Sequence, residues 1–226
     1  MFSLPKLYYG YFLKRYKRFF VDIDYKGTVL TAHNPNTGSM RNLLKEGREV
    51  AFSKNDNPKR KLKYTLESFR VDNYWVYTNT IKVNKIVENA LRDGEITELN
   101  GFQEIIREYT ILNSKIDFNL DINGQENLVE VKSVSLFDET HAMFPDAVTT
   151  RGQRHLRTLR ESVEMGYKAY VLYIIQSDRK KFRCADEIDS RYCEIFEEIK
   201  KAGVNILLYR NVMDIGRNVC YLERLD

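Results

Sequence analysis

The stretch IDFNLDINGQENLVEVKSV, residues 116–134, decides how the second half of this chain folds. Two runs, 116–122 and 128–134, flank Asn123-Gly124, a dipeptide typical of the tight turn between antiparallel strands. With the turn centred there, successive pairs outward from it place Asp117 directly opposite Glu130. Like charges that face each other normally weaken a sheet, so we expect a compensating group nearby.

Lys132 lies two residues beyond Glu130, so strand alternation puts its amine on the same face as both carboxylates. In this pattern Asp117 and Glu130 bind Mg²⁺ or Mn²⁺ through oxygen, and the lysine orients water or offsets charge during phosphodiester hydrolysis. Glu88, on the preceding helix, is the candidate third acid. The alternatives are a salt-bridged, exposed strand face and, for Glu88, a solvated helix face. The residues expected on the opposite face, in a core, are Ile116, Phe118, Val129 and Val131.

Helices and strands alternate from about Thr78 onward. A helix that ends at Asp93-Gly94 is followed by a strand near 104–110 and by the hairpin. The later elements are a helix that ends near Gly166 and then segments at 169–175 (strand), 192–202 (helix) and 204–208 (strand). This order predicts an α/β domain, a mixed sheet flanked by helices.

The chain before about Tyr77 has a different pattern of short strands. Alternation in 19–25 and β-branched residues in 28–31 favour strands, and turn residues follow in 34–38 and 55–58. This spacing predicts a small β-barrel. We therefore divide the chain into a barrel domain, residues 1–78, and an α/β domain, residues 79–226.

Positive charge is concentrated at the front of the chain. The protein carries +4 overall, but residues 1–70 hold 15 Lys/Arg against 6 Asp/Glu, whereas the remainder holds 21 against 26. Clustered cations that alternate with aromatics are typical of barrels that bind nucleic-acid phosphates. Barrel packing for the aromatics and simple solvation for the cations are the alternatives. The candidate DNA-binding residues are Lys14, Arg15, Lys17, Arg18, Lys59, Arg60, Lys61, Lys63, Arg151 and Arg154.

Several protein classes are disfavoured. No apolar run approaches the roughly 18 residues of a membrane-spanning helix. The first residues lack the basic flank and apolar stretch of a secretory signal, so we expect a cytoplasmic protein with no membrane partner. The three cysteines, Cys184, Cys193 and Cys220, show no metal-binding spacing, and we expect them to be reduced packing residues.

Five segments resemble the sugar fermentation stimulation protein A (SfsA) family: 32–40, 56–62, 116–118, 129–132 and 144–156. The resemblance runs through nearly the whole chain. It implies an N-terminal OB-like barrel and a C-terminal PD-(D/E)XK nuclease-like domain, with the nuclease signature on Asp117, Glu130 and Lys132 and with Glu88 as the helical acid. Asn34 stands where many members have cysteine, which argues against thiol chemistry in that loop.

The resemblance also implies DNA binding with little sequence preference and a role in regulating sugar (maltose) metabolism. Taken with the opposed acids, it favours a DNA-binding protein with a Mg²⁺-dependent nuclease site. A non-enzymatic regulator that uses the domain as a scaffold and an RNA-processing nuclease are the alternatives. A homodimer is left open. His155, one helical turn after Arg151, either contacts the scissile phosphate or is hydrogen-bonded in the core.

Overall fold

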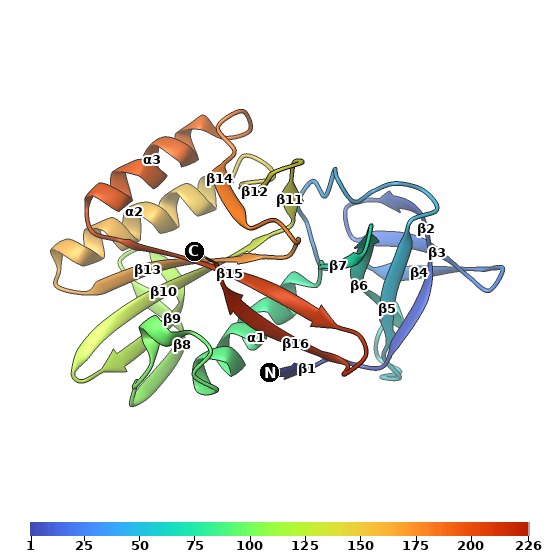
Figure 1. Ribbon diagram of the computed structural model, residues 1–226, viewed down its shortest axis with the longest axis horizontal. Coiled ribbons are helices and arrows are strands. Elements are labelled where there is room, and N and C mark those ends of the chain that lie inside the picture. Colours follow the sequence, from blue (N-terminus) through green and yellow to red (C-terminus); the bar gives the residue numbers. More distant parts are fainter. Residues whose placement is uncertain (226) are drawn as a thin grey trace.

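Six strands near the N-terminus wrap into a small barrel, at the right of Figure 1. Their order is β4-β3-β2-β5-β6-β7, and a parallel pairing of β4 with β6 closes the barrel. The protein is seen here in a computed structural model that describes residues 1–225. The barrel strands are β2 (Leu7–Tyr16), β3 (Phe20–Tyr25), β4 (Thr28–His33), β5 (Glu49–Lys54), β6 (Tyr64–Val71) and β7 (Tyr74–Tyr77).

Apolar side chains from several barrel strands meet in one core. Val21 and Ile23 on β3 contribute to it with Phe52 on β5 and with Leu66 and Phe69 on β6, and all five are fully buried. Of these residues, only Val21 and Ile23 lie in a segment whose alternation was read from the sequence, and the burial of both agrees with that alternation.

The second domain is built on a seven-stranded mixed sheet in the order β1-β16-β15-β13-β10-β9-β8. The central strands β10, β13 and β15 are parallel, and the outer pairs are antiparallel. The strands are β1 (Phe2–Ser3), β8 (Glu104–Ile111), β9 (Ser114–Ile122), β10 (Gln125–Val134), β13 (Lys168–Ile175), β15 (Asn205–Asp214) and β16 (Val219–Arg224). Because β1 pairs with β16, the first few residues belong structurally with this sheet rather than with the barrel.

Helices cover both faces of the sheet (Figure 1). α1 (Thr80–Arg92) packs against one face, in a core that includes Leu172 of β13. α2 (Thr150–Glu164) and α3 (Ser190–Lys201) pack on the other, in a core that includes Val171. A short 3₁₀ helix, η1 (Thr97–Leu99), follows α1. No helix within residues 1–225 has the length and apolar character needed to cross a membrane.

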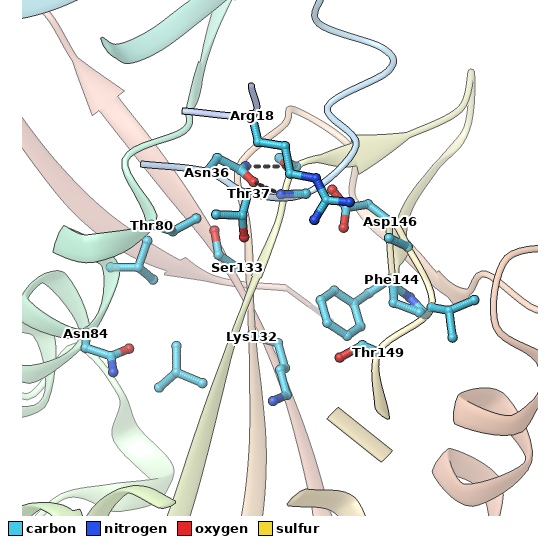
Figure 2. A pocket seen from close by; sticks show the side chains of 17 residues that line it. Arg18, Asn36, Thr37, Thr80, Asn84, Lys132, Ser133, Phe144, Asp146 and Thr149 are labelled. Carbon is cyan, nitrogen blue, oxygen red and sulfur yellow. Dashed lines mark hydrogen bonds between the residues drawn. The ribbon is translucent and has the colours of Figure 1, made fainter. Parts of the chain in front are cut away.

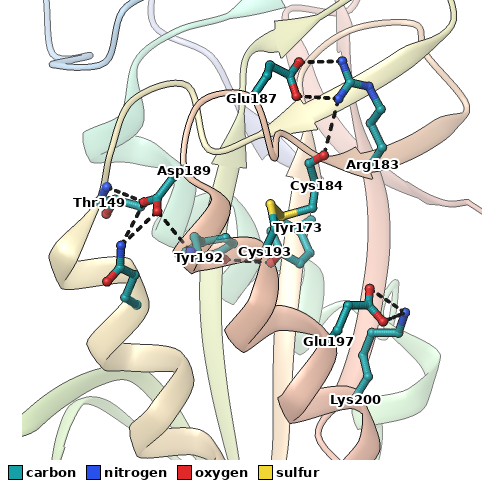
Figure 3. Close-up of a disulfide and its surroundings, with 11 residues drawn as sticks. Thr149, Tyr173, Arg183, Cys184, Glu187, Asp189, Tyr192, Cys193, Glu197 and Lys200 are labelled. Carbon is teal, nitrogen blue, oxygen red and sulfur yellow. Dashed lines mark hydrogen bonds and ion pairs between the residues drawn. A yellow bond between two sulfur atoms is a disulfide. The ribbon is translucent and has the colours of Figure 1, made fainter.

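A second, small sheet lies beside α3 and was not predicted from the sequence. It consists of β11 (Leu136–Phe137), β12 (His141–Phe144) and β14 (Lys181–Cys184), in that order. Cys184 at the end of β14 forms a disulfide with Cys193 on α3 (Figure 3). The prediction of three reduced cysteines is therefore wrong for this pair, because strand and helix packing brings together two residues whose spacing is unremarkable. Cys220 is free and buried.

Candidate functional site

The hairpin has the predicted register. β9 and β10 pair from Ile122↔Gln125 to Phe118↔Val129, so the next positions outward are Asp117 and Glu130. The backbone ladder ends there, and the Asp117 carboxylate itself accepts the Val131 N–H at 2.8 Å. Asp117 thus lies where the backbone hydrogen bonds between the two strands end and a side chain takes over the bond to the neighbouring strand.

This change also moves Ile116 to a different core. Phe118, Val129 and Val131 share one core, as predicted, and this core is the one beneath α1, whereas Ile116 packs in the core beneath α2. The prediction that all four residues share one face is therefore wrong for Ile116. Strict alternation fails at Asp117, where the paired ladder is interrupted.

Glu130 is almost fully buried, with only 2% of its surface exposed. Its Oε1 accepts hydrogen bonds from Lys132 Nζ at 2.6 Å and from His155 Nδ1 at 2.5 Å. These two contacts hold the pKa of Glu130 below its ordinary value even though burial, the largest single influence, raises it. Lys132 is the compensating group expected beside the two acids. Because His155 is 3% exposed and bonded to Glu130, the core-histidine interpretation is the one that fits.

The pKa of Asp117 is shifted in the opposite direction to that of Glu130. Burial, followed by repulsion from Glu130, raises its pKa to about 6. The Val131 N–H, Lys132 and Asn84 each favour the charged form, and the Asn84 amide donates to Asp117 Oδ1 at 2.7 Å. The two acids therefore interact electrostatically across the hairpin, as the register predicts.

One oxygen of this pair has no partner. Among the residues that the structure describes, no donor reaches Glu130 Oε2, which is buried. A buried anionic oxygen normally has a partner, and carboxylate oxygens are the preferred ligands of hard divalent cations. The oxygens of Asp117 and Glu130 therefore fit a hard divalent cation, and Lys132 would lie next to it.

Glu88 is the predicted site residue that the structure does not bring to this pair. Its two carboxylate oxygens form ion pairs with Arg92 on α1 and Arg107 on β8. The α1 side chain that contacts Asp117 is Asn84, one helical turn earlier. Within residues 1–225 no cluster of three or more His, Cys, Asp or Glu side chains is arranged to hold a metal ion. Asn84 was missed because an amide carries no acid signature, although it lies on the same helix four residues before Glu88.

A cavity of about 460 Å³ opens beside Lys132, where the two domains meet (Figure 2). Its walls come from the barrel domain, from α1, from β10 and from the segment before α2. Residues that line it include Arg18, Asn36, Thr37, Asn84, Lys132 and Asp146. The side chain of Lys132 thus bonds the buried Glu130 and also lines an open cavity of mixed polar and apolar character.

The candidate DNA-binding residues fall into three groups. Lys14, Lys17 and Arg18 are exposed at the β2–β3 hairpin, whereas Arg15 is half-buried and donates to the carbonyl oxygens of Asn36, Gly38 and Ser39. Arg15 therefore holds a loop in place. The second group is in the segment between β5 and β6, where Lys59, Lys61 and Lys63 are exposed and Arg60 contacts Thr65. The third group, Arg151 and Arg154 on α2, lines a second cavity of about 450 Å³.

Comparisons with known proteins cover both domains. A family model described as "SfsA N-terminal OB domain" matches residues 13–78, and one described as "Sugar fermentation stimulation protein RE domain" matches residues 81–217. These matches agree with the predicted OB-like barrel and nuclease-like domain.

Curated relatives and a solved structure are similar along nearly the whole chain. The "Sugar fermentation stimulation protein homolog" of Syntrophotalea carbinolica is 46% identical over 204 residues, which are 89% of this chain and 88% of that protein. The homolog from Pelagibacter ubique is 47% identical over 204 residues, again 89% of this chain and 88% of that protein. The structure of Pyrococcus furiosus SfsA in complex with Ca²⁺ matches with a TM-score of 0.91 at 26% identity, over 99% of this chain and 97% of that one.

Proposed function

Because the chain belongs to the sugar fermentation stimulation protein (SfsA) family, we propose that it is a DNA-binding protein whose second domain cleaves phosphodiester bonds with Mg²⁺ or Mn²⁺. The observation that carries this proposal is a pair of acids, Glu130 buried and Asp117 half-buried, with one unsatisfied Glu130 oxygen and a lysine beside it. The Ca²⁺ named for the Pyrococcus furiosus relative supports an oxygen-ligated divalent site in this fold.

Each residue of the site has a defined part in this proposal. Asp117 and Glu130 would hold the cation, and Asn84 and the Val131 N–H orient Asp117 toward it. When bound, the ion would polarise the phosphoryl oxygen and lower the pKa of a water molecule. Lys132, whose amine is fixed by Glu130, donates toward the phosphate or the attacking water in the adjoining cavity.

His155 acts through Glu130 rather than on the substrate. Its Nδ1 donates to Glu130 Oε1, and its Nε2 lies 3.4 Å from Arg151 Nε. A histidine that orients a ligating carboxylate typically affects metal affinity or activity by about 10- to 100-fold. We therefore assign His155 a positioning role.

The proposal is tested by incubating purified protein with single-stranded, duplex and branched DNA in Mg²⁺ or Mn²⁺. We expect cleavage of at least one substrate and a loss of about 100-fold or more in Asp117→Ala and Glu130→Gln. Metal-induced thermal stabilisation provides a second readout, and we expect both variants to lose it. Matched RNA oligomers show which sugar is accepted.

Glu126→Gln is the matched control, because Glu126 lies on β10 like Glu130 but is exposed. This variant should cleave DNA and bind metal like the wild type. Absence of cleavage on every substrate, or equal cleavage by Glu130→Gln and the wild type, would remove the catalytic proposal.

A further inference from the structure

Apart from His155, which bonds Glu130, the two segments that carry the family resemblance, 32–40 and 144–156, take no part in holding the two acids. They meet instead around the cavity beside Lys132. Asn36 and Thr37 come from the first segment, and Phe144 and Asp146 come from the second (Figure 2). The cavity thus requires both domains, whereas the acid pair belongs to the second domain alone.

The part of the cavity wall that comes from segment 32–40 is held firmly in place. Arg15 donates to the carbonyl oxygens of Asn36 and Gly38 at 2.9 and 2.8 Å, and the Asn36 side chain accepts the Gly38 N–H. Gly38 also packs directly on Asp146, since a Cβ at this position would lie 2.1 Å from Asp146 Oδ2. The barrel loop and the segment before α2 are therefore in direct contact, which preforms the cavity.

Besides the carboxylate of Asp146, the lining of the cavity combines three kinds of group that bear on a nucleotide. Arg18 and Lys132 supply positive charge, and Asn36 and Thr37 supply hydrogen-bonding groups. Phe144 supplies an aromatic ring, which is itself braced by the rings of Tyr173 and Tyr192. Cations suit a phosphate, amide and hydroxyl groups suit a sugar or a base edge, and an aromatic ring suits a base.

The size of the cavity favours a single unpaired nucleotide over a base in a paired duplex. Its volume of about 460 Å³ lies in the range of roughly 300 to 1,000 Å³ found for pockets that enclose one small organic ligand. A base inside a stacked, paired duplex cannot reach such a pocket unless its nucleotide is turned out of the helix. A nucleotide that is already unpaired enters without that cost.

We propose that this interdomain cavity binds one unpaired nucleotide of a DNA strand, with the base toward Phe144 and Asn36 and a phosphate toward Lys132. The proposal rests on the proposed function, because it makes the cavity the substrate pocket of that same site. It names the substrate class as DNA that contains an unpaired nucleotide, located either within a strand or at a strand end.

The experiment measures binding without cleavage, by fluorescence anisotropy in EDTA with the full chain. The probes are a fully paired duplex and three otherwise identical duplexes with one unpaired nucleotide, as an internal bulge, a 3′ overhang or a 5′ overhang. Thr37→Phe narrows the cavity from an exposed position. Thr28→Phe, at an exposed position of β4, is the matched control.

We expect the wild type to bind at least one unpaired probe about tenfold or more tightly than the paired duplex, since turning out a paired base costs a few kcal/mol. Thr37→Phe should abolish this preference and leave the affinity for the paired duplex unchanged, while Thr28→Phe keeps it. The probe that is preferred identifies the source of the nucleotide. Equal wild-type affinity for all four probes, or a preference that survives in Thr37→Phe, overturns the inference. Because no cleavage is measured, failure here is distinct from failure of the nuclease proposal.

Discussion

Asp117 and Glu130 are neighbours whose surroundings shift their pKa values in opposite directions. Burial and repulsion from Glu130 raise the pKa of Asp117 to about 6. For Glu130 the effect of burial is outweighed by Lys132 and His155, which lower its pKa. The pair thus carries one firmly charged carboxylate and one that titrates close to neutrality, a combination that is frequent at functional sites.

The shift of Asp117 predicts two opposite pH dependences. A divalent cation competes with the proton on Asp117, so metal affinity should rise as the pH increases through about 6. The stability of the metal-free protein should instead decrease as the pH rises. Its folded state binds more protons between the ordinary pKa of 3.8 and about 6, so the free energy of unfolding falls as the pH rises through this window. Thermal unfolding with and without Mg²⁺ across this range measures both effects.

The Asp117→Asn variant separates the pH dependence caused by Asp117 from that caused by other titrating groups. It should abolish the pH-dependent metal stabilisation. At neutral pH the metal-free variant should be more stable than the wild type, by up to about 3 kcal/mol, because it buries no charge beside Glu130. A variant that retains the wild-type pH profile would show that Asp117 does not titrate in this range.

At the scale of elements, the β9–β10 hairpin was predictable because its signals are local. Asn123-Gly124 sets the turn, and a side-chain period of two carries the register from Gln125 to Val129. Continued one step outward, this register puts Asp117 opposite Glu130, and the spacing puts Lys132 beside Glu130, although the alternation itself fails at Asp117.

The features that were not predicted depend on contacts between distant elements. The ion pair of Glu88 with Arg107 joins α1 to β8, and the bond between His155 and Glu130 joins α2 to β10. Cys184 and Cys193 meet only because β14 packs beside α3. None of these contacts leaves a periodic signal in the sequence, because each is set by how layers pack rather than by neighbours along the chain.

The disulfide yields a prediction about the stability of this region. It joins two residues that are nine positions apart, Cys184 and Cys193, and the loop between them contains Asp189. Asp189 accepts the N–H groups of Tyr192 on α3 and Thr149 at the start of α2 (Figure 3). A closed loop of this length stabilises the folded state by about 2 to 3 kcal/mol through chain entropy. We expect the double variant Cys184→Ser, Cys193→Ser to lose that amount in urea denaturation.

Wild-type protein in a strong reductant is the internal control for this variant. Its unfolding midpoint should shift to that of the double variant, and the reductant should leave the variant itself unchanged. Identical denaturation curves for wild type and variant under oxidising conditions would contradict a stabilising disulfide.

Across the whole molecule, the boundary between the two domains is also the boundary between the cationic and the more acidic part of the sequence. The cationic front of the sequence is the barrel, and the more acidic remainder is the sheet with its helices. Not every cation in the barrel is free for phosphate, since Arg15 is engaged with the 36–39 loop. In the β5–β6 segment Lys59 and Lys61 are exposed, and the half-buried Arg60 contacts only a side-chain hydroxyl of its own segment's end, that of Thr65, which makes this cluster the better test of the proposed DNA contact.

Replacing Lys59, Arg60 and Lys61 together by alanine should weaken binding to all DNA sequences about equally. Each phosphate contact contributes about 0.9 to the slope of log affinity against log salt, so losing three contacts should reduce that slope by up to about 3. Anisotropy titrations over a range of salt concentrations measure it. A triple alanine variant of Lys180, Lys181 and Lys201, which are exposed and lie in the second domain, removes the same charge. If net charge alone governed binding, both variants would flatten the slope alike. If the barrel binds the phosphates, only the first will do so.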